Sequence, residues 1–310
     1  DGLFRITPNQ KDFSTPVYKQ FIHEKNKPKS LSSNNTSTLF FDLNGILWIG
    51  TDNGINKFDS NSGSFTHFNI QTKNSKAPLS PFDQSVNAIY ESKNGTFWLG
   101  TLSGLVKFER GSGTYKLFPH KYEINRYGWG NIIAIIEDLQ RKLWLATPSE
   151  LMRFDPITSS YDYFINDPFN PKSVSFSSIS SLYLDKTGIV WVGTAGMAIN
   201  LYDSKADRFS TLSKIKESGS RITGFSVRSI LEESKDLVWV STGVLYRWNR
   251  KTGELKSYET SSDRLDDFGN TGAWTMIKSA DGKIWTATTE GLYRYDPSTE
   301  KDDFQQQKSF

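Results

Sequence analysis

Histidines and paired acids are the residues of this sequence that could do acid–base or metal chemistry. The three histidines, His23, His67 and His120, lie far apart and form no H-x-H or H-E-x-x-H pattern, which argues against a metal site or a general base built from them. Adjacent acids occur, as at 232–233 and 266–267, but neighbouring residues on a strand point to opposite faces and do not flank one glycosidic bond. The sequence therefore predicts no catalytic residue, no metal and no cofactor.

Aromatic and polar side chains recur in the segments that lead into five of the six repeats, and these are the candidate binding residues; the first repeat has Ser33 in place of the aromatic residue. Trp129 stands out because its surroundings, residues 126–131, depart from the repeat, and loop residues of this kind often carry function. Aromatic rings beside hydrogen-bonding groups suit a carbohydrate, although the same rings could instead fix the loops onto the sheets beneath. The predicted ligand-binding residues are Phe82, Arg126, Tyr127, Trp129, Asn131, Phe176, Arg221, Phe225, Phe268 and Asn270.

The elements that position these segments form a repeat centred on tryptophan. Six copies of a motif close to Leu-Trp-Ile-Gly-Thr follow one another at intervals of about 46 to 50 residues, which indicates a repeat architecture. Each indole is flanked by apolar residues in a short strand. We therefore expect core packing, and not a sugar-stacking ladder, at these six positions: Trp48, Trp98, Trp144, Trp191, Trp239 and Trp285.

Each repeat contains four strand-like segments. In the second repeat they are 86–90, 97–101, 105–108 and 115–118, and Asn94-Gly95 is a strong hairpin signal between the first two. A four-stranded antiparallel unit of this length is typical of a β-propeller blade, which completes its core by stacking on its neighbours. The fourth residue of each motif is small, as at Gly50 and Gly100. We expect it to let adjacent sheets approach.

The whole chain is predicted to be one all-β domain, a β-propeller with four-stranded blades. The opening residues match a third and a fourth strand, so the chain supplies half a blade and six full ones, which favours a seven-bladed ring and a fragment of a longer protein. No segment has the 3.6-residue periodicity of a helical solenoid. The half blade spans 1–25, and the full blades span 30–70, 79–118, 126–165, 174–212, 222–260 and 270–310.

Composition excludes several classes of protein. With 37 basic and 34 acidic residues the formal charge is +3, too small and too scattered for a nucleic-acid-binding face. The chain has no cysteine, which rules out disulfides and thiolate metal sites. No apolar run approaches the roughly 20 residues of a membrane span. Hydrophobic residues at 36% and aromatic residues at 14% suit many short, half-buried strands.

The repeats resemble those of the two-component-regulator propeller family. Their pattern is D-x-x-G-x-L-W-I-G-T followed by x-x-G-L-x-[KR]-[FY]-D, and residues 42–51 with 52–59 follow it closely. The resemblance extends over nearly the whole chain and weakens in the third and fourth repeats, at 148–150 and 196–198.

The resemblance implies a periplasmic sensor region of a hybrid two-component histidine kinase of the Bacteroidetes type. It implies an oligosaccharide ligand released from a complex glycan, a second propeller and an immunoglobulin-like domain in the same protein, and a homodimer. The kinase would lie elsewhere in the full-length protein, and this fragment would be non-enzymatic and outside the membrane. The small basic surplus slightly favours an acidic sugar.

Two other functions remain open at this point. Propellers with related motifs include streptogramin-lyase-like enzymes, which use a metal and a histidine facing the channel; an ordered divalent metal at the channel mouth would support that alternative. The third hypothesis is a scaffold that binds only protein, and its mark would be a large exposed apolar patch.

Overall fold

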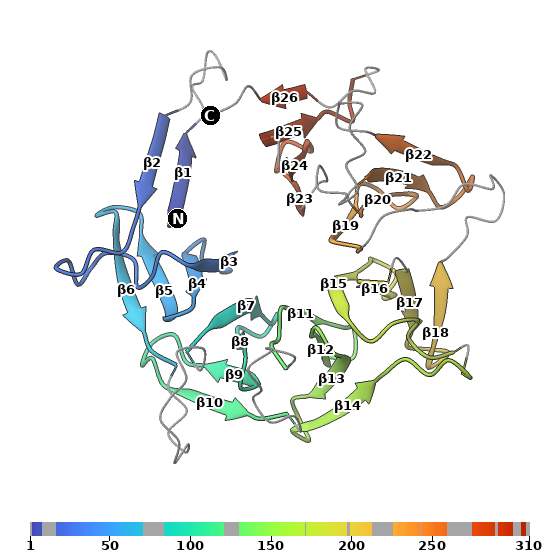
Figure 1. Ribbon diagram of the computed structural model, residues 1–310, viewed down its shortest axis with the longest axis horizontal. Coiled ribbons are helices and arrows are strands. Elements are labelled where there is room, and N and C mark those ends of the chain that lie inside the picture. Colours follow the sequence, from blue (N-terminus) through green and yellow to red (C-terminus); the bar gives the residue numbers. More distant parts are fainter. Residues whose placement is uncertain are drawn as a thin grey trace. The chain divides into compact units, whose positions relative to one another are not determined.

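The computed structural model describes residues 2–7, 17–70, 84–120, 130–170, 172–196, 199–212, 226–242, 244–258, 275–288, 291–299 and 305–307. These residues form strands, turns and loops, with no helix among them (Figure 1). The chain divides into two compact units, residues 1–162 and 163–310, and each is described by itself. The part of the chain that is described also holds no helix long and apolar enough to cross a membrane.

The first unit begins with a two-stranded antiparallel sheet, and two complete four-stranded sheets and most of a third follow. Within each sheet the strands pair in sequence order. The two-stranded sheet contains β1 (Leu3–Thr7) and β2 (Val17–Phe21). Blade 1 contains β3 (Thr36–Phe41), β4 (Leu47–Thr51), β5 (Gly54–Asp59) and β6 (Ser64–Phe68); blade 2 contains β7 (Val86–Glu91), β8 (Phe97–Thr101), β9 (Leu105–Phe108) and β10 (Tyr115–Phe118); blade 3 contains β11 (Ala134–Glu137), β12 (Leu143–Ala146), β13 (Leu151–Asp155) and β14 (Ser160–Phe164).

The second unit begins within β14 and contains three further four-stranded sheets with the same order of strands. Blade 4 contains β15 (Ile179–Leu184), β16 (Val190–Thr194), β17 (Ile199–Asp203) and β18 (Arg208–Leu212); blade 5 contains β19 (Ser229–Glu232), β20 (Leu237–Ser241), β21 (Leu245–Asn249) and β22 (Leu255–Tyr258); blade 6 contains β23 (Thr275–Lys278), β24 (Ile284–Thr288), β25 (Gly291–Tyr295) and β26 (Gln305–Gln307).

The predicted all-β propeller of four-stranded antiparallel blades is confirmed, but the number of blades differs from the expected seven. The described residues form six complete blades, and β1 and β2 remain a sheet of two strands. They pair as a third and a fourth strand do, because Leu3 lies opposite Phe21 just as Ile55 lies opposite Phe68. A seventh blade would need a first and a second strand beside β1, and no described strand takes those places.

The acid that opens the repeat motif holds the turn between the first two strands. Asp42 Oδ1 accepts the backbone N–H groups of Asn44 at 3.0 Å and Ile46 at 2.9 Å, while its Oδ2 accepts the indole N–H of Trp48 at 2.9 Å. Gly45 completes the turn with a φ of 77°, a left-handed conformation that favours glycine. One carboxylate therefore satisfies both the turn and the buried indole. Asp138 and Asp185 do the same in blades 3 and 4.

Within each unit, tryptophans fill the space between consecutive blades. Trp48 lies 5.2 Å from the ring of Phe97 and 6.0 Å from that of Phe108, both in blade 2. Five of the six indoles expected in the core are buried, namely Trp48, Trp98, Trp144, Trp191 and Trp239. Trp285 differs from the expectation because it is only partly buried. Its indole lies in blade 6, and in the second unit no further described sheet follows that blade to cover it.

Small residues allow the blades to approach each other, as predicted. A Cβ on Gly50 would lie 2.3 Å from the carbonyl oxygen of Val86, and one on Gly100 would lie 2.6 Å from that of Ile132. Both carbonyls belong to the first strand of the next blade or to the residues just before it. A side chain at either glycine would push the backbones of neighbouring sheets apart.

Candidate functional site

Most of the predicted ligand-binding residues lie outside the described part of the chain. These are Phe82, Arg126, Tyr127, Trp129, Arg221, Phe225, Phe268 and Asn270. Asn131 and Phe176 are described, the first in unit 1 and the second in unit 2. The structure therefore shows how the ends of two of the predicted loops are held.

Asn131 belongs to a rigid anchor at the start of blade 3. Its side-chain oxygen accepts a hydrogen bond from Nδ2 of Asn87 at 2.8 Å, and the neighbouring Ile132 is fully buried. Gly130 lies against His120 so closely that an added Cβ would be 2.5 Å from the ring. His120 Nε2 is 3.0 Å from the Gly130 carbonyl oxygen. The amide pair and the histidine thus fix the chain at residues 130–132, directly after the predicted Trp129 segment.

His120 is buried and follows β10, the fourth strand of blade 2. Burial lowers the pKa of His120, and contacts with the backbone carbonyls of Gly130 and Leu102 oppose that shift only in part. His23 Nδ1 lies 2.8 Å from the Leu31 carbonyl oxygen, and the His67 ring contacts the carbonyl of Ser30. All three imidazoles therefore hold loop backbone. In the described ranges, no three His, Cys, Asp or Glu side chains gather as metal ligands would.

Phe176 combines a structural contact with an exposed ring. Its side chain packs closely against Gly196, where an added Cβ would be 2.8 Å from Cγ of the phenylalanine. It nevertheless keeps 46% of its surface exposed. The ring is thus fixed onto the turn that follows β16, and its exposed part can contact a ligand.

Buried polar residues lie beneath the loops that lead into blades 1 and 4, and sequence reasoning missed them. Asn56 is fully buried; its Oδ1 accepts the backbone N–H of Ser32 at 3.0 Å and its Nδ2 donates to Oγ of Ser32 at 2.7 Å. Asn200 makes the matching pair of bonds with Ser175. The sequence did contain a signal for these buried polar residues. An asparagine stands in the third strand at a position that is apolar or aromatic in the other blades.

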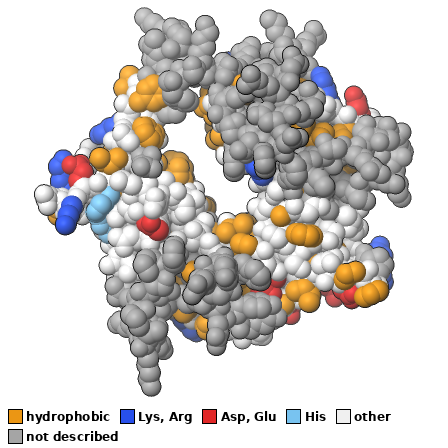
Figure 2. Space-filling view, viewed as in Figure 1, with side chains coloured by type: hydrophobic (Ala, Val, Ile, Leu, Met, Phe, Trp, Pro, Cys, Tyr) orange, Lys and Arg blue, Asp and Glu red, His pale blue; other side chains and the backbone are white. Residues whose placement is uncertain are grey.

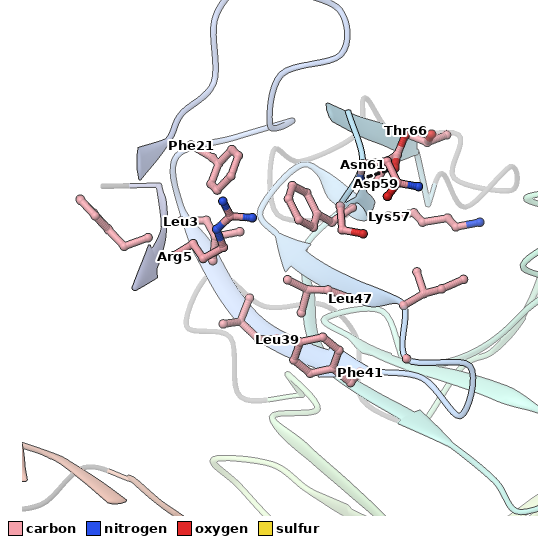
Figure 3. Close-up of a pocket in the computed structure, with 15 residues that line it drawn as sticks. Leu3, Arg5, Phe21, Leu39, Phe41, Leu47, Lys57, Asp59, Asn61 and Thr66 are labelled. Carbon is pink, nitrogen blue, oxygen red and sulfur yellow. Dashed lines mark hydrogen bonds between the residues drawn. The ribbon is translucent and has the colours of Figure 1, made fainter. Parts of the chain in front are cut away.

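A groove in unit 1 was also not expected from the sequence. It lies between β1 and β3, and its volume is about 720 Å³. Figure 3 shows Leu3, Arg5 and Phe21 on one side of it, and Leu39, Phe41 and Leu47 on the other. Polar side chains of Lys57, Asp59, Asn61 and Thr66 lie at one end. Hydrophobic side chains also reach the surface near β1 in Figure 2.

Comparisons with known proteins agree with the repeat seen in the sequence. Residues 80–103 and 173–196 match the sequence model of the two component regulator propeller family. Each stretch ends two residues after the second strand of its blade, which is β8 in blade 2 and β16 in blade 4. The sequence matches none of the curated proteins with which it was compared.

Several solved structures share the fold. The extracellular domain of the proposed hybrid two component system BT4673 from B. thetaiotaomicron aligns with a TM-score of 0.67 at 20% identity, covering 95% of this chain and 38% of that one. PorZ, a surface component of the type-IX secretion system of Porphyromonas gingivalis, aligns with a TM-score of 0.61 at 14% identity, covering 90% and 42%. This chain therefore spans well under half the length of those proteins.

At these identities the structural likeness establishes the fold alone, and the family model identifies two of the repeats. The chain has the fold of a β-propeller, and two of its repeats, at residues 80–103 and 173–196, match the two component regulator propeller.

Proposed function

We propose that this chain is an extracytoplasmic sensor module of a hybrid two-component signalling protein. The observation that carries the proposal is the match of two separate repeats, 80–103 and 173–196, to the two component regulator propeller. The shared fold with an extracellular domain of a proposed hybrid two component system supports it. The kinase, a second propeller, an immunoglobulin-like domain and a membrane anchor would belong to the rest of the protein, located in the bacterial inner membrane with this part in the periplasm.

The proposed ligand is an oligosaccharide derived from a glycan. Phe176 offers a ring that is held in place on Gly196 and is still 46% exposed. Rigid aromatic faces bind the apolar C–H faces of sugars with little loss of conformational entropy. In unit 1, the hydrogen-bonded amides of Asn87 and Asn131 offer polar groups at the entry to blade 3. The net charge of +3 favours a uronic or sulfated sugar over a cationic one.

Signalling would follow from differential binding. A ligand that binds one arrangement of the assembled sensor more tightly than another shifts the population toward it. The propeller itself needs no catalytic group for this role. In a homodimer of the full-length protein, the two arrangements would differ in how the two subunits are positioned relative to each other.

Calorimetric titration of the 310-residue chain against a panel of neutral and acidic oligosaccharides tests the proposal. We expect one class to bind, with affinity reduced about tenfold or more by Trp129→Ala or Phe176→Ala, as for a truncated aromatic anchor. Phe169→Ala is the matched control, because Phe169 lies in the same connection as Phe176 and is 96% exposed. Binding by no member of the panel would remove the support for a glycan sensor.

A second readout separates binding from turnover. The bound oligosaccharide is recovered after incubation with the chain, with and without added Mg²⁺ or Ca²⁺, and its length is measured. A sensor returns it unchanged, whereas cleavage that depends on the metal would favour a propeller enzyme.

A further inference from the structure

The second residue after a fourth strand holds the segment that leads into the next blade at three places in the chain. After β10 it is His120, whose Nε2 lies 3.0 Å from the Gly130 carbonyl oxygen. After β14 it is Asn166, whose Nδ2 donates to the Val174 carbonyl oxygen at 2.9 Å. After β2 it is His23, which contacts a carbonyl in the same way. One position of the repeat therefore carries an imidazole, which titrates, in unit 1 and an amide, which does not, in unit 2.

His120 is the most deeply buried of these three side chains, with 8% of its surface exposed. Its ring meets two backbone carbonyls, that of Gly130 and that of Leu102 in the turn between β8 and β9. The absence of a side chain at Gly130 permits the contact, because an added Cβ would lie 2.5 Å from Cε1 of the ring. The ring therefore joins blade 2 to the segment that enters blade 3.

The charge on this ring decides how favourable its burial is. A neutral imidazole carries one N–H and donates a full hydrogen bond to only one of the two carbonyls, whereas an imidazolium carries two N–H groups. Burial opposes the imidazolium, because the charged form loses its hydration. Burial prevails over the two carbonyls, and no charged side chain among the described residues adds to the balance, so the pKa of His120 lies below its ordinary value of 6.5. The neutral ring is the form that fits the closed contact.

We propose that His120 makes the entry to blade 3 sensitive to pH, because its neutral ring fixes residues 130–132 onto blade 2 and its protonation releases them. The opened segment binds the proton more tightly than the closed one. The free energy that favours closure is therefore fully present above pH 6.5 and decreases as the pH falls through that value. Asn131, one of the predicted ligand-binding residues, would be released with the segment. Weaker ligand binding in acid would follow, and this last step alone rests on the proposed function.

Hydrogen exchange of single amides, measured by NMR on the full 310-residue chain without ligand, tests the release. The reporter is the amide of Ile132, which donates to the Thr101 carbonyl at 3.3 Å. The matched control is the amide of Val227, which donates to the Thr194 carbonyl at 3.1 Å at the entry to blade 5. Unit 2 contains no histidine.

The protection factor, which corrects each exchange rate for the rate of an unstructured chain at the same pH, should change at one amide only. We expect that of Ile132 to fall about tenfold between pH 7 and pH 5, and by no more than about thirtyfold, because the opened imidazole titrates near pH 6.5. The protection factor of Val227 should stay within about twofold.

His120→Gln separates the proton from the contact. Glutamine can place an amide N–H near the position of Nε2, and it does not titrate. We expect the pH difference at Ile132 to shrink below about twofold, while protection at pH 7 stays within about threefold of the unchanged chain. His23→Gln is the control at an exposed histidine, and it should leave the tenfold difference in place.

Titration of the imidazole Cε1 protons by NMR gives a readout that needs no variant. The approach of Gly130 to Cε1 allows the His120 signal to be assigned through its contact with the Gly130 α-protons. We expect its midpoint to lie below pH 6.5. A midpoint at or above 6.5, equal protection of Ile132 at the two pH values, or a pH difference that persists in His120→Gln would each overturn the proposal. Failure to bind a glycan would not, because none of these measurements uses a ligand.

Discussion

Two junctions between blades have the same geometry but different charges. One joins blades 1 and 2, and the other joins blades 2 and 3. At the first, Arg110 joins Asp42 at 2.9 Å and Glu91 at 2.7 Å, and both carboxylates are almost fully buried. At the second, the position of Asp42 is taken by Ser92, which accepts the indole N–H of Trp98 at 3.2 Å. Residue 156, at the position of Arg110, is a proline.

The junctions within the second unit follow the same rule. In blade 4, Asp185 lies in the turn after the first strand. Arg250 of blade 5 forms ion pairs with Asp185 at 2.9 Å and with Glu232 of blade 5 at 3.6 Å. Blade 6 has Lys278 where blade 2 has Glu91 and Pro297 where blade 2 has Arg110. The arginine thus occurs only where two acids from neighbouring blades would otherwise face each other. Electrostatics, and not the sheet geometry, decides its presence.

Removal of Arg110 should have the largest effect. Arg110→Ala leaves Asp42 and Glu91 buried without their cation, and breaking a buried ion pair in this way costs about 3 kcal/mol or more. We expect a clear decrease in the urea midpoint and in the thermal midpoint. Arg141→Ala is the control, because its pair with Glu137 is 3.5 Å long and the arginine is 57% exposed. Equal effects of the two substitutions would show that the bridge does not hold the junction.

Introducing a second acid at the junction of blades 2 and 3 should lower the stability of the fold by an intermediate amount. Ser92→Asp places a second acid beside Glu137, and we expect a loss of about 1 kcal/mol at neutral pH. Ser92→Asn, which adds similar volume without charge, should lose less. Adding Glu137→Gln to Ser92→Asp should restore most of the loss. If the double variant stays as unstable as Ser92→Asp, then packing and not charge separates the junctions.

The smallest expected effect is the response of the bridges to acid. Burial alone would raise the pKa of Asp42, but hydrogen bonds from Trp48, Ile46 and Asn44 and the charge of Arg110 outweigh it and lower the pKa below 3.8. The pKa of Asp185 is also lowered, because hydrogen bonds from Thr187, Trp191 and Ile189 outweigh burial.

A carboxyl with a lowered native pKa stabilises the fold above its unfolded pKa, and that stability disappears as the pH falls through the native pKa. Each aspartate should therefore contribute stability that is present at pH 6 and is lost as the pH falls below about 4. Urea midpoints measured from pH 6 to pH 3 check this. Asp42→Asn should flatten the profile, while Asp59→Asn, at an exposed turn, should leave most of it. An unchanged profile for Asp42→Asn would contradict the assignment.

Much of the local structure could be predicted from single repeats. The Asn-Gly and Asp-Gly turns, the alternating strands and the small residue at Gly50 were visible because each rests on chemistry within a few residues of sequence. The role of Asp42 was less visible, since it depends on the indole six residues later. The candidate binding loops could be identified from the sequence, but their arrangement in space could not. Their composition shows which side chains they contain and not which of these side chains contact each other.

Sequence alone thus determined the kind of unit and its repetition, because strand pairing and turn chemistry are local. Only the tertiary structure showed that Arg110 joins acids from two blades and that Trp48 packs against Phe97 and Phe108 of the next blade. Both depend on the contact between one repeat and its neighbour. That contact joins residues some 50 to 70 positions apart, and no pattern within a single repeat specifies it.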